Sequence, residues 1–370
     1  MLTRRLRGLV ADDVGGKDWV NFAKGVAIIL VVLYHSMLFL RSIEFEGGGM
    51  GRAKTALEMF PMPVFLAIAG MYHQRVVTWT LGETWRRRLL GYLYLYVLWS
   101  VIRFAFYLVV PNVRSDGAGS YASDPLALLT ILVWPISSYW FILALAVFTL
   151  VLWLVRKLPP WIPITGAAVL SIAFSTGFVT VRNVGWDRMG EYLVFFLVGA
   201  LAARKLFAAV PKAPWWVVPA SLAVYGASAA VAAFVPAGSR VPGVVLVGQV
   251  AAVVFGATAS HLLVRLRPLS WVSYLGTRSL HLYLIHVFVI AGLAAVVQAL
   301  PQLSLLPGRG FLVLGAMVVL VIAISALLGR LLSRVSWLYV PPRLRRRTPP
   351  SSRTDGSAVP ASEPARSVRS

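Results

Sequence analysis

Cysteine is absent from this chain, and acidic side chains are scarce, with 13 Asp and Glu against 35 Lys and Arg. The lack of cysteine excludes disulfides, thiolate metal sites and cysteine nucleophiles. Carboxylates are nearly absent from the interiors of the apolar runs. This disfavours a proton- or sodium-coupled pump, because such pumps usually need a buried acid. Phosphate-loop, dinucleotide-binding and nucleophile-elbow motifs are also missing.

Apolar residues dominate what is there. They make up 59% of the chain, only 13% is charged, and the mean hydropathy is +0.78. A soluble domain could not hide that much apolar surface, so the lipid bilayer must solvate most of the chain. A spanning helix needs about 20 apolar residues. We therefore predict an all-α, polytopic transmembrane bundle of about ten spans, near residues 20–40, 57–75, 89–110, 138–155, 161–178, 189–203, 215–235, 243–264, 279–299 and 310–332.

The net charge of +22 lies between the apolar segments and in the C-terminal part. Arg and Lys are denser in alternate gaps, so the positive-inside rule predicts that both termini are cytoplasmic. We expect a multi-pass protein of the inner (plasma) membrane without a cleavable signal peptide. Nucleic-acid binding is not expected, because no soluble basic domain or stacking platform is visible. The expected parts are a cytoplasmic segment (1–19), a transmembrane domain (20–335) and a disordered basic cytoplasmic tail (336–370).

Ionisable residues inside apolar spans are informative, because each is costly unless it is paired or faces a cavity. Lys24 and His35 both lie in the first expected span, eleven residues apart. That spacing is close to three helical turns, so the two side chains share one face and are separated by roughly 16 Å along the axis. Two interpretations remain open: a lysine that extends to the interface beside a structural histidine, or a pair of site residues.

Two further ionisable residues fall inside spans, His286 and Arg103. His281, five residues before His286, points about 140° away from it. Two metal ligands on one helix face need a spacing of three or four, so no metal site is predicted. Arg103 must face protein or water, either as a structural ion-pair partner or as a site cation. The remaining candidates, expected in ordinary interfacial or solvated positions at helix ends, are His73, Glu58 and Glu191.

Five segments form an ordered series of motifs. Lys24 and His35 enclose ten residues, and four apolar or basic segments follow at Met62–Gly70, Trp85–Leu90, Tyr139–Leu143 and Leu275–His286. Together the five resemble the motifs of the integral-membrane acyltransferase-3 family, whose first helix carries an Arg or Lys, ten residues and then His. The resemblance covers roughly residues 17–330.

This resemblance implies an enzyme that moves an acyl group, such as acetyl, from acyl-CoA to a hydroxyl of a sugar, surface glycan or glycosylated metabolite. It implies His35 as the general base, with a covalent acyl-histidine as a variant. Acyl-CoA would be a donor substrate, not a bound cofactor. Its phosphates would be held by Lys24, Arg86, Arg87 and Arg88. The acceptor would bind near Arg103, Trp140, Tyr283 and His286.

Two other interpretations remain open, and the first of them would use the same cationic cavity. The chain could be a carrier or flippase for an anionic or lipid-linked small substrate, or a membrane scaffold without chemistry. Turnover of acyl-CoA separates the enzyme from both, whereas composition does not.

Overall fold

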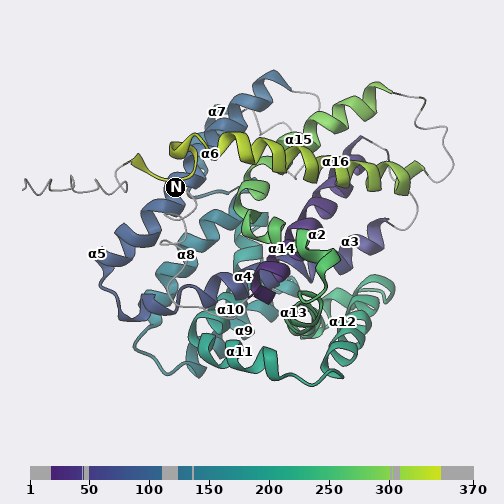
Figure 1. Cartoon of the computed structure of the whole chain (residues 1–370). Helices are drawn as coiled ribbons and strands as arrows, with labels where there is room; N and C mark the ends of the chain where they lie inside the picture. The colour runs from purple at the N-terminus through teal and green to yellow at the C-terminus, as the bar shows by residue number, and fades with distance from the viewer. Residues whose placement is uncertain are drawn as a thin grey trace, which may run out of the picture.

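A computed structural model describes residues 18–43, 45, 50–110, 124–135, 137–300, 302 and 309–342. Every regular element within these ranges is helical (Figure 1). The first half of the described chain forms α2 (Asp18–Ser42), α3 (Met50–Glu58), α4 (Pro61–Met71), α5 (Leu81–Thr84), a π-helical turn η2 (Trp85–Leu89), α6 (Leu90–Val109), α7 (Pro125–Thr130), α8 (Trp140–Val155) and α9 (Trp161–Ser175).

The second half forms α10 (Val184–Leu201), α11 (Ala203–Ala209), α12 (Val217–Phe234), α13 (Val244–Leu263), α14 (Ser270–Thr277), α15 (Ser279–Ala299) and α16 (Arg309–Leu332). Short 3-10 turns join some of these helices. They include η1 (Gln74–Thr78), η5 (Gly238–Arg240) and, after α16, η8 (Ser336–Leu338).

Six helices of the described chain are long and apolar enough to cross a membrane, or up to seven if the bent pair α10 and α11 is one span. The predicted count of about ten is therefore not confirmed, although helices lie in all ten predicted ranges. The clearest difference is at 57–75. Pro61 has no N–H to extend a preceding helix and instead begins α4, which has 11 residues. At 1.5 Å per residue, α4 covers about half of the hydrocarbon thickness. The cytoplasmic location of both ends stays a prediction.

Helix α2 lies in the middle of the bundle (Figure 1) and packs against α4, α13, α14, α15 and α16. Its approach to α14 is especially close. A Cβ added at Gly25 would overlap the carbonyl oxygen of Val272, and one added at Gly276 would overlap the carbonyl oxygen of Asn21. Small residues at such crossings let membrane helices meet backbone to backbone. The α2–α14 contact thus fixes the helix that carries Lys24 and His35.

We expect Gly276→Ala to destabilise the chain by about 1–3 kcal/mol, because the new methyl group would force the backbones of α2 and α14 apart. Gly91→Ala is the matched control, since Gly91 lies in α6 with open space around its Cβ position. Alanine there should be neutral or stabilise by roughly 0.5–1 kcal/mol. Thermal unfolding of the two purified variants measures the difference. Equal melting temperatures would show that α2 and α14 can move apart to accept the methyl group without a loss of stability.

Residues 336–342 were assigned to the tail from sequence, and the structure shows that they pack against α6. The indole Nε1 of Trp99 donates to the carbonyl of Leu338 at 2.9 Å, and the hydroxyl of Tyr94 donates to the carbonyl of Trp337 at 2.7 Å. The predicted cytoplasmic N-terminal segment up to Lys17 and the predicted disordered tail from Arg343 onward lie outside the described residues.

Candidate active site

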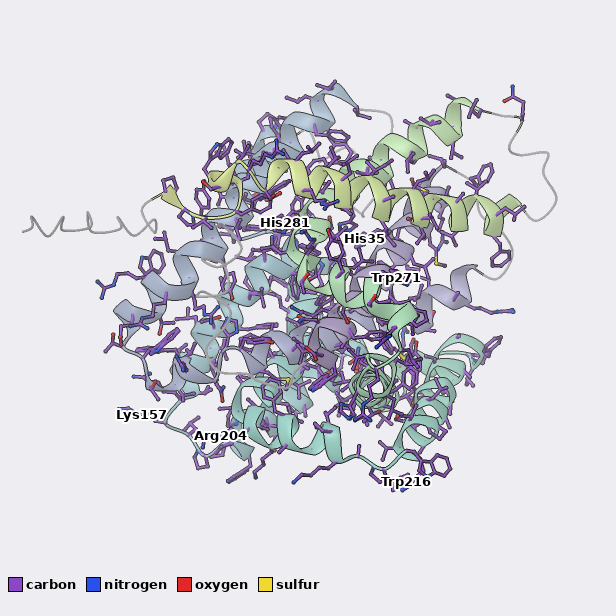
Figure 2. All side chains as sticks on the ribbon, in the orientation of Figure 1. His35, Lys157, Arg204, Trp216, Trp271 and His281 are labelled. Carbon is purple, nitrogen blue, oxygen red and sulfur yellow. The ribbon has the colours of Figure 1, made fainter. Side chains whose placement is uncertain are left out.

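Two histidines from distant parts of the sequence meet inside the bundle. The rings of His35 on α2 and His286 on α15 are 5.0 Å apart between centroids and stand nearly edge to face. His286 is fully buried, and His35 is half-buried. In Figure 2, His35 lies well inside the bundle, whereas Lys157, Arg204 and Trp216 mark its lower margin. The structure thus joins two residues that the sequence singled out separately.

Backbone contacts fix the tautomer of each ring. The Nδ1 atom of His35 lies 3.0 Å from the carbonyl of Val31, and that of His286 lies 2.7 Å from the carbonyl of Tyr283. Because a carbonyl only accepts hydrogen bonds, each Nδ1 carries the proton and each Nε2 keeps a lone pair. The Nε2 of His286 is buried and has no hydrogen-bond partner among the described residues. An oriented imidazole with a basic Nε2 is the arrangement that a general base requires.

Aromatic side chains surround this pair. The ring of Tyr283 lies 5.7 Å from that of His286, and its hydroxyl donates to the carbonyl of Ser138. Trp140 stands one layer further out, with its ring stacked on Tyr192 at 6.1 Å. The structure therefore places Tyr283 beside His286, and Trp140 is connected to Tyr283 through the ring of Phe141.

Arg103, the cation expected near the acceptor, is buried in α6 with 4% exposure. Its guanidinium lies over the ring of Tyr107, 4.9 Å from the centroid. One turn from Arg103, Phe106 packs edge to face on Phe288 of α15. Arg103 is thus held on the helix that contacts α15 close to His286.

The three arginines expected to hold the donor are not equivalent. Arg86 and Arg87 are exposed, whereas Arg88 is half-buried and donates from Nη2 to the carbonyl of Tyr72 at 3.2 Å. They lie in the π-helical turn η2, and such turns shift the helical register and recur at functional sites. Lys24 is half-buried near the start of α2, and no described contact joins it to the arginines. The structure does not assemble the four cations into one cluster.

His73 was expected in an ordinary interfacial position, and the structure shows it to be buried. Its Nδ1 donates to the carbonyl of Ala69 at 2.6 Å, and its Nε2 accepts from the hydroxyl of Tyr92 at 2.9 Å. Burial, followed by the nearby charge of Arg88, lowers the pKa of His73 to about 3. His73 is therefore a neutral group that links Tyr92 of α6 to the end of α4.

The expectation that Glu58 and Glu191 are solvated is wrong for Glu191 and only partly right for Glu58. Glu191 is 6% exposed, and Glu58 is half-buried. Arg188 holds both, with Nη1 2.9 Å from Glu191 Oε2 and Nη2 3.1 Å from Glu58 Oε1. The hydroxyl of Tyr34, next to His35, donates to Glu58 at 2.9 Å. The spacing of Arg188 and Glu191, one helical turn apart, was the signal in the sequence that could have revealed this network.

Metal chemistry gains no support from the described residues, because no three His, Asp or Glu side chains among them are grouped to hold an ion. The chemistry available at the histidine pair is proton transfer by imidazole.

Residues 17–330, most of the chain, match the profile of the acyltransferase-3 family, described as an acyltransferase domain. The match includes both histidines of the pair. No curated protein and no solved structure matches the chain. The resemblance carried by the five motifs is thereby confirmed. This protein belongs to the acyltransferase-3 family and is a membrane acyltransferase.

Proposed function

We propose that the chain transfers an acyl group from acyl-CoA to a hydroxyl of a sugar, surface glycan or glycosylated metabolite, in the inner (plasma) membrane, with His35 as the general base. The observation that supports this most is the His35–His286 pair, in which both Nδ1 atoms are bound to backbone carbonyls and both Nε2 atoms retain a lone pair. A packing histidine would not need a second imidazole beside it in an apolar interior.

In the proposed reaction, Nε2 of His35 takes the proton from the acceptor hydroxyl as its oxygen attacks the thioester carbonyl. The tetrahedral intermediate collapses with cleavage of the carbon–sulfur bond, and the CoA thiolate leaves and takes the proton from His35. The products are the acyl ester and CoA. The neutral ring of His286 lies beside the transient imidazolium of His35, at a centroid separation of 5.0 Å, and its Nε2 lone pair favours that positive charge. Arg103, buried on the helix that contacts α15 close to His286, is the cation available to stabilise the oxyanion.

Turnover by the purified protein tests this proposal. With radiolabelled acetyl-CoA and a hydroxylated acceptor such as a methyl glucoside, label should move to the acceptor and free CoA should appear in equal amount. A carrier would bind or move its substrate and leave the thioester intact. Acceptor-dependent release of CoA therefore distinguishes the enzyme from the carrier.

Arg88→Gln should raise the Michaelis constant for acetyl-CoA by roughly 10–100-fold, because the loss of a charge-assisted hydrogen bond costs about 1.5–3 kcal/mol. Arg204→Gln is the control. Arg204 is exposed on α11 and is not among the arginines assigned to the donor, so its loss should change the constant little. Initial rates at varied acetyl-CoA give both values. Unchanged donor affinity in a correctly inserted Arg88→Gln variant would make the arginines topology determinants only.

A further inference from the structure

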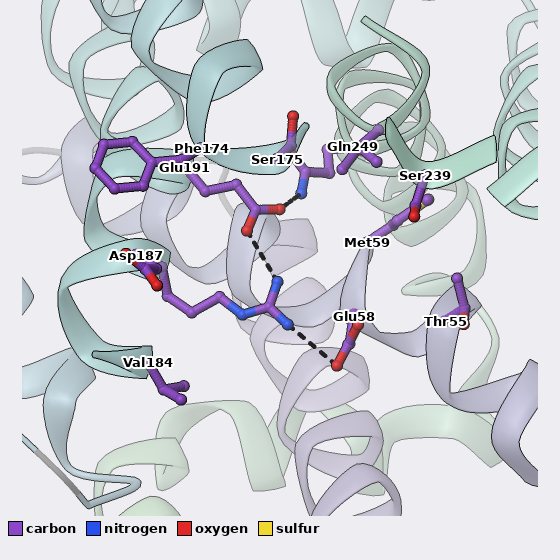
Figure 3. Close-up of a pocket in the computed structure, with 12 residues that line it drawn as sticks. Thr55, Glu58, Met59, Phe174, Ser175, Val184, Asp187, Glu191, Ser239 and Gln249 are labelled. Atoms are coloured by element: carbon purple, nitrogen blue, oxygen red, sulfur yellow. Dashed lines mark hydrogen bonds and ion pairs between the residues drawn. The ribbon is translucent and has the colours of Figure 1, made fainter. Parts of the chain in front are cut away.

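A polar cavity lies where the end of α3 meets the first turns of α10 and α13. Its volume is about 360 Å³, at the small end of the range for small-molecule pockets. Figure 3 shows its lining, which includes carboxylates from α3 and α10 and, next to Glu191, the amide of Gln249 from α13. Its polar lining includes Thr55, Glu58, Asp187, Arg188, Glu191 and Gln249. The function proposed above does not yet use this cavity.

In this cavity the guanidinium of Arg188 and the amide nitrogen of Gln249 are already paired, whereas one buried acceptor of the described lining is not. Arg188 gives its donors to Glu58, Glu191 and the hydroxyl of Tyr192. The amide nitrogen of Gln249 donates to Glu191 Oε1. The amide oxygen of Gln249 is different: Gln249 is fully buried, and this oxygen has no hydrogen-bond partner among the described residues. A buried acceptor without a partner is costly. The cavity therefore presents acceptors and favours a ligand that brings donors.

The charge in the cavity disfavours anions. Burial raises the pKa of Glu58, but Arg188, Lys54 and the hydroxyl of Tyr34 outweigh burial, so the net pKa lies below its ordinary value. Glu58 is thus ionised at neutral pH. Arg188 is already shared by two carboxylates, and Asp187 adds a third carboxylate to the lining. A phosphate or carboxylate ligand would meet these charges, and Arg188, the cation among the described lining residues, is already paired, whereas hydroxyl groups would donate to the carboxylates.

Two links connect the cavity to the histidine pair. Tyr34, whose hydroxyl donates to Glu58, precedes His35 on α2, and the two rings are 5.4 Å apart between centroids. On the other side, Tyr192 receives a hydrogen bond from Arg188 and stacks on Trp140. The cavity is therefore connected through Glu58 and the Tyr34 hydroxyl to the turn of α2 that carries the proposed base.

We infer that this cavity is the acceptor subsite and that it binds a neutral, multiply hydroxylated ligand through Glu58, Glu191 and Gln249, while it rejects anionic analogues. That the ligand is the acyl acceptor rests on the proposed function; the binding and its selectivity do not. Gln249 is the determining residue, because its amide oxygen lacks a partner until a hydroxyl donates to it.

Direct binding to the full chain tests the inference without any acyl transfer. Isothermal titration in lipid nanodiscs, free of glycosidic detergent, would compare methyl β-D-glucopyranoside with glucose 6-phosphate. The neutral glucoside should bind at least about tenfold more tightly. Gln249→Leu should weaken glucoside binding about tenfold or more, the fold-change expected when one buried hydrogen bond to a polar group is lost. Thr258→Val is the matched control, because Thr258 lies on the same helix outside the cavity and bonds only within α13.

His35→Gln separates this inference from the proposed function, since it should keep glucoside binding while transfer is lost. If the wild type transfers acyl groups but Gln249→Leu binds the glucoside as tightly as the wild type does, the subsite alone is overturned. Binding without transfer would overturn the enzyme alone. Equal or tighter binding of glucose 6-phosphate, or no binding of the glucoside, would also refute the subsite. That comparison uses the wild type, so it decides the matter even if Gln249→Leu does not fold.

Discussion

His35→Gln should reduce acyl transfer by about 10²–10⁴-fold, the usual cost of losing a general base. Glutamine keeps a hydrogen-bonding side chain of similar size on α2, but it cannot accept the proton of the acceptor hydroxyl. The half-buried position of His35, with Nδ1 bound to the carbonyl of Val31, tolerates such a replacement. Label transfer from acetyl-CoA, normalised to inserted protein, measures the loss.

His281→Gln is the control for that experiment. His281 lies on α15 like His286, but its ring stacks on Tyr339, 4.3 Å away between centroids. The His281→Gln variant should therefore keep its acyl-transfer activity. Near-normal turnover by His35→Gln would identify His35 as a packing histidine. The proposed mechanism would then have no base, and a carrier would become the better interpretation.

Arg188→Met should destabilise the chain by roughly 3 kcal/mol, because it leaves the carboxylates of Glu58 and Glu191 without their cation. Removing one partner of a buried ion pair costs about 3–5 kcal/mol. The lower end of this range of free energies applies here, since 26% of the Arg188 side chain is exposed. Arg204→Met on exposed α11 should change stability by no more than about 0.5 kcal/mol.

Thermal unfolding of the two arginine variants measures this difference. A triple variant that also carries Glu58→Gln and Glu191→Gln should recover much of the stability, because no unpaired charge is left. If Arg188→Met alone unfolds like the wild type, the carboxylates of Glu58 and Glu191 are solvated after all, as the sequence first indicated.

The sequence anticipated the parts of the site that depend on spacing along one helix. Lys24 and His35 on one face of α2, and His286 inside α15, were all predicted from apolar spans with ionisable residues in them. The meeting of His35 with His286 depends on the packing of helices some 250 residues apart in the chain, which periodicity does not encode.

Two expectations were missed for different physical reasons. Glu191 looked solvated because its partners, Arg188 and Gln249, come from one helical turn away and from another helix. The span expected at 57–75 is not confirmed as one helix, because an apolar window hides the break that Pro61 makes between α3 and α4. The all-helical fold, by contrast, follows from composition and run length alone.

The contact between α6 and the segment after α16 has a consequence for synthesis. Trp99 is buried, and its indole donates to the carbonyl of Leu338, which is 239 residues later in the chain. At about 5–20 residues per second, translation needs roughly 10–50 s to supply that carbonyl. During this time the second long helix of the described chain, α6, carries an indole N–H without its final acceptor. Completion of the bundle is thus tied to arrival of the last residues before the basic tail.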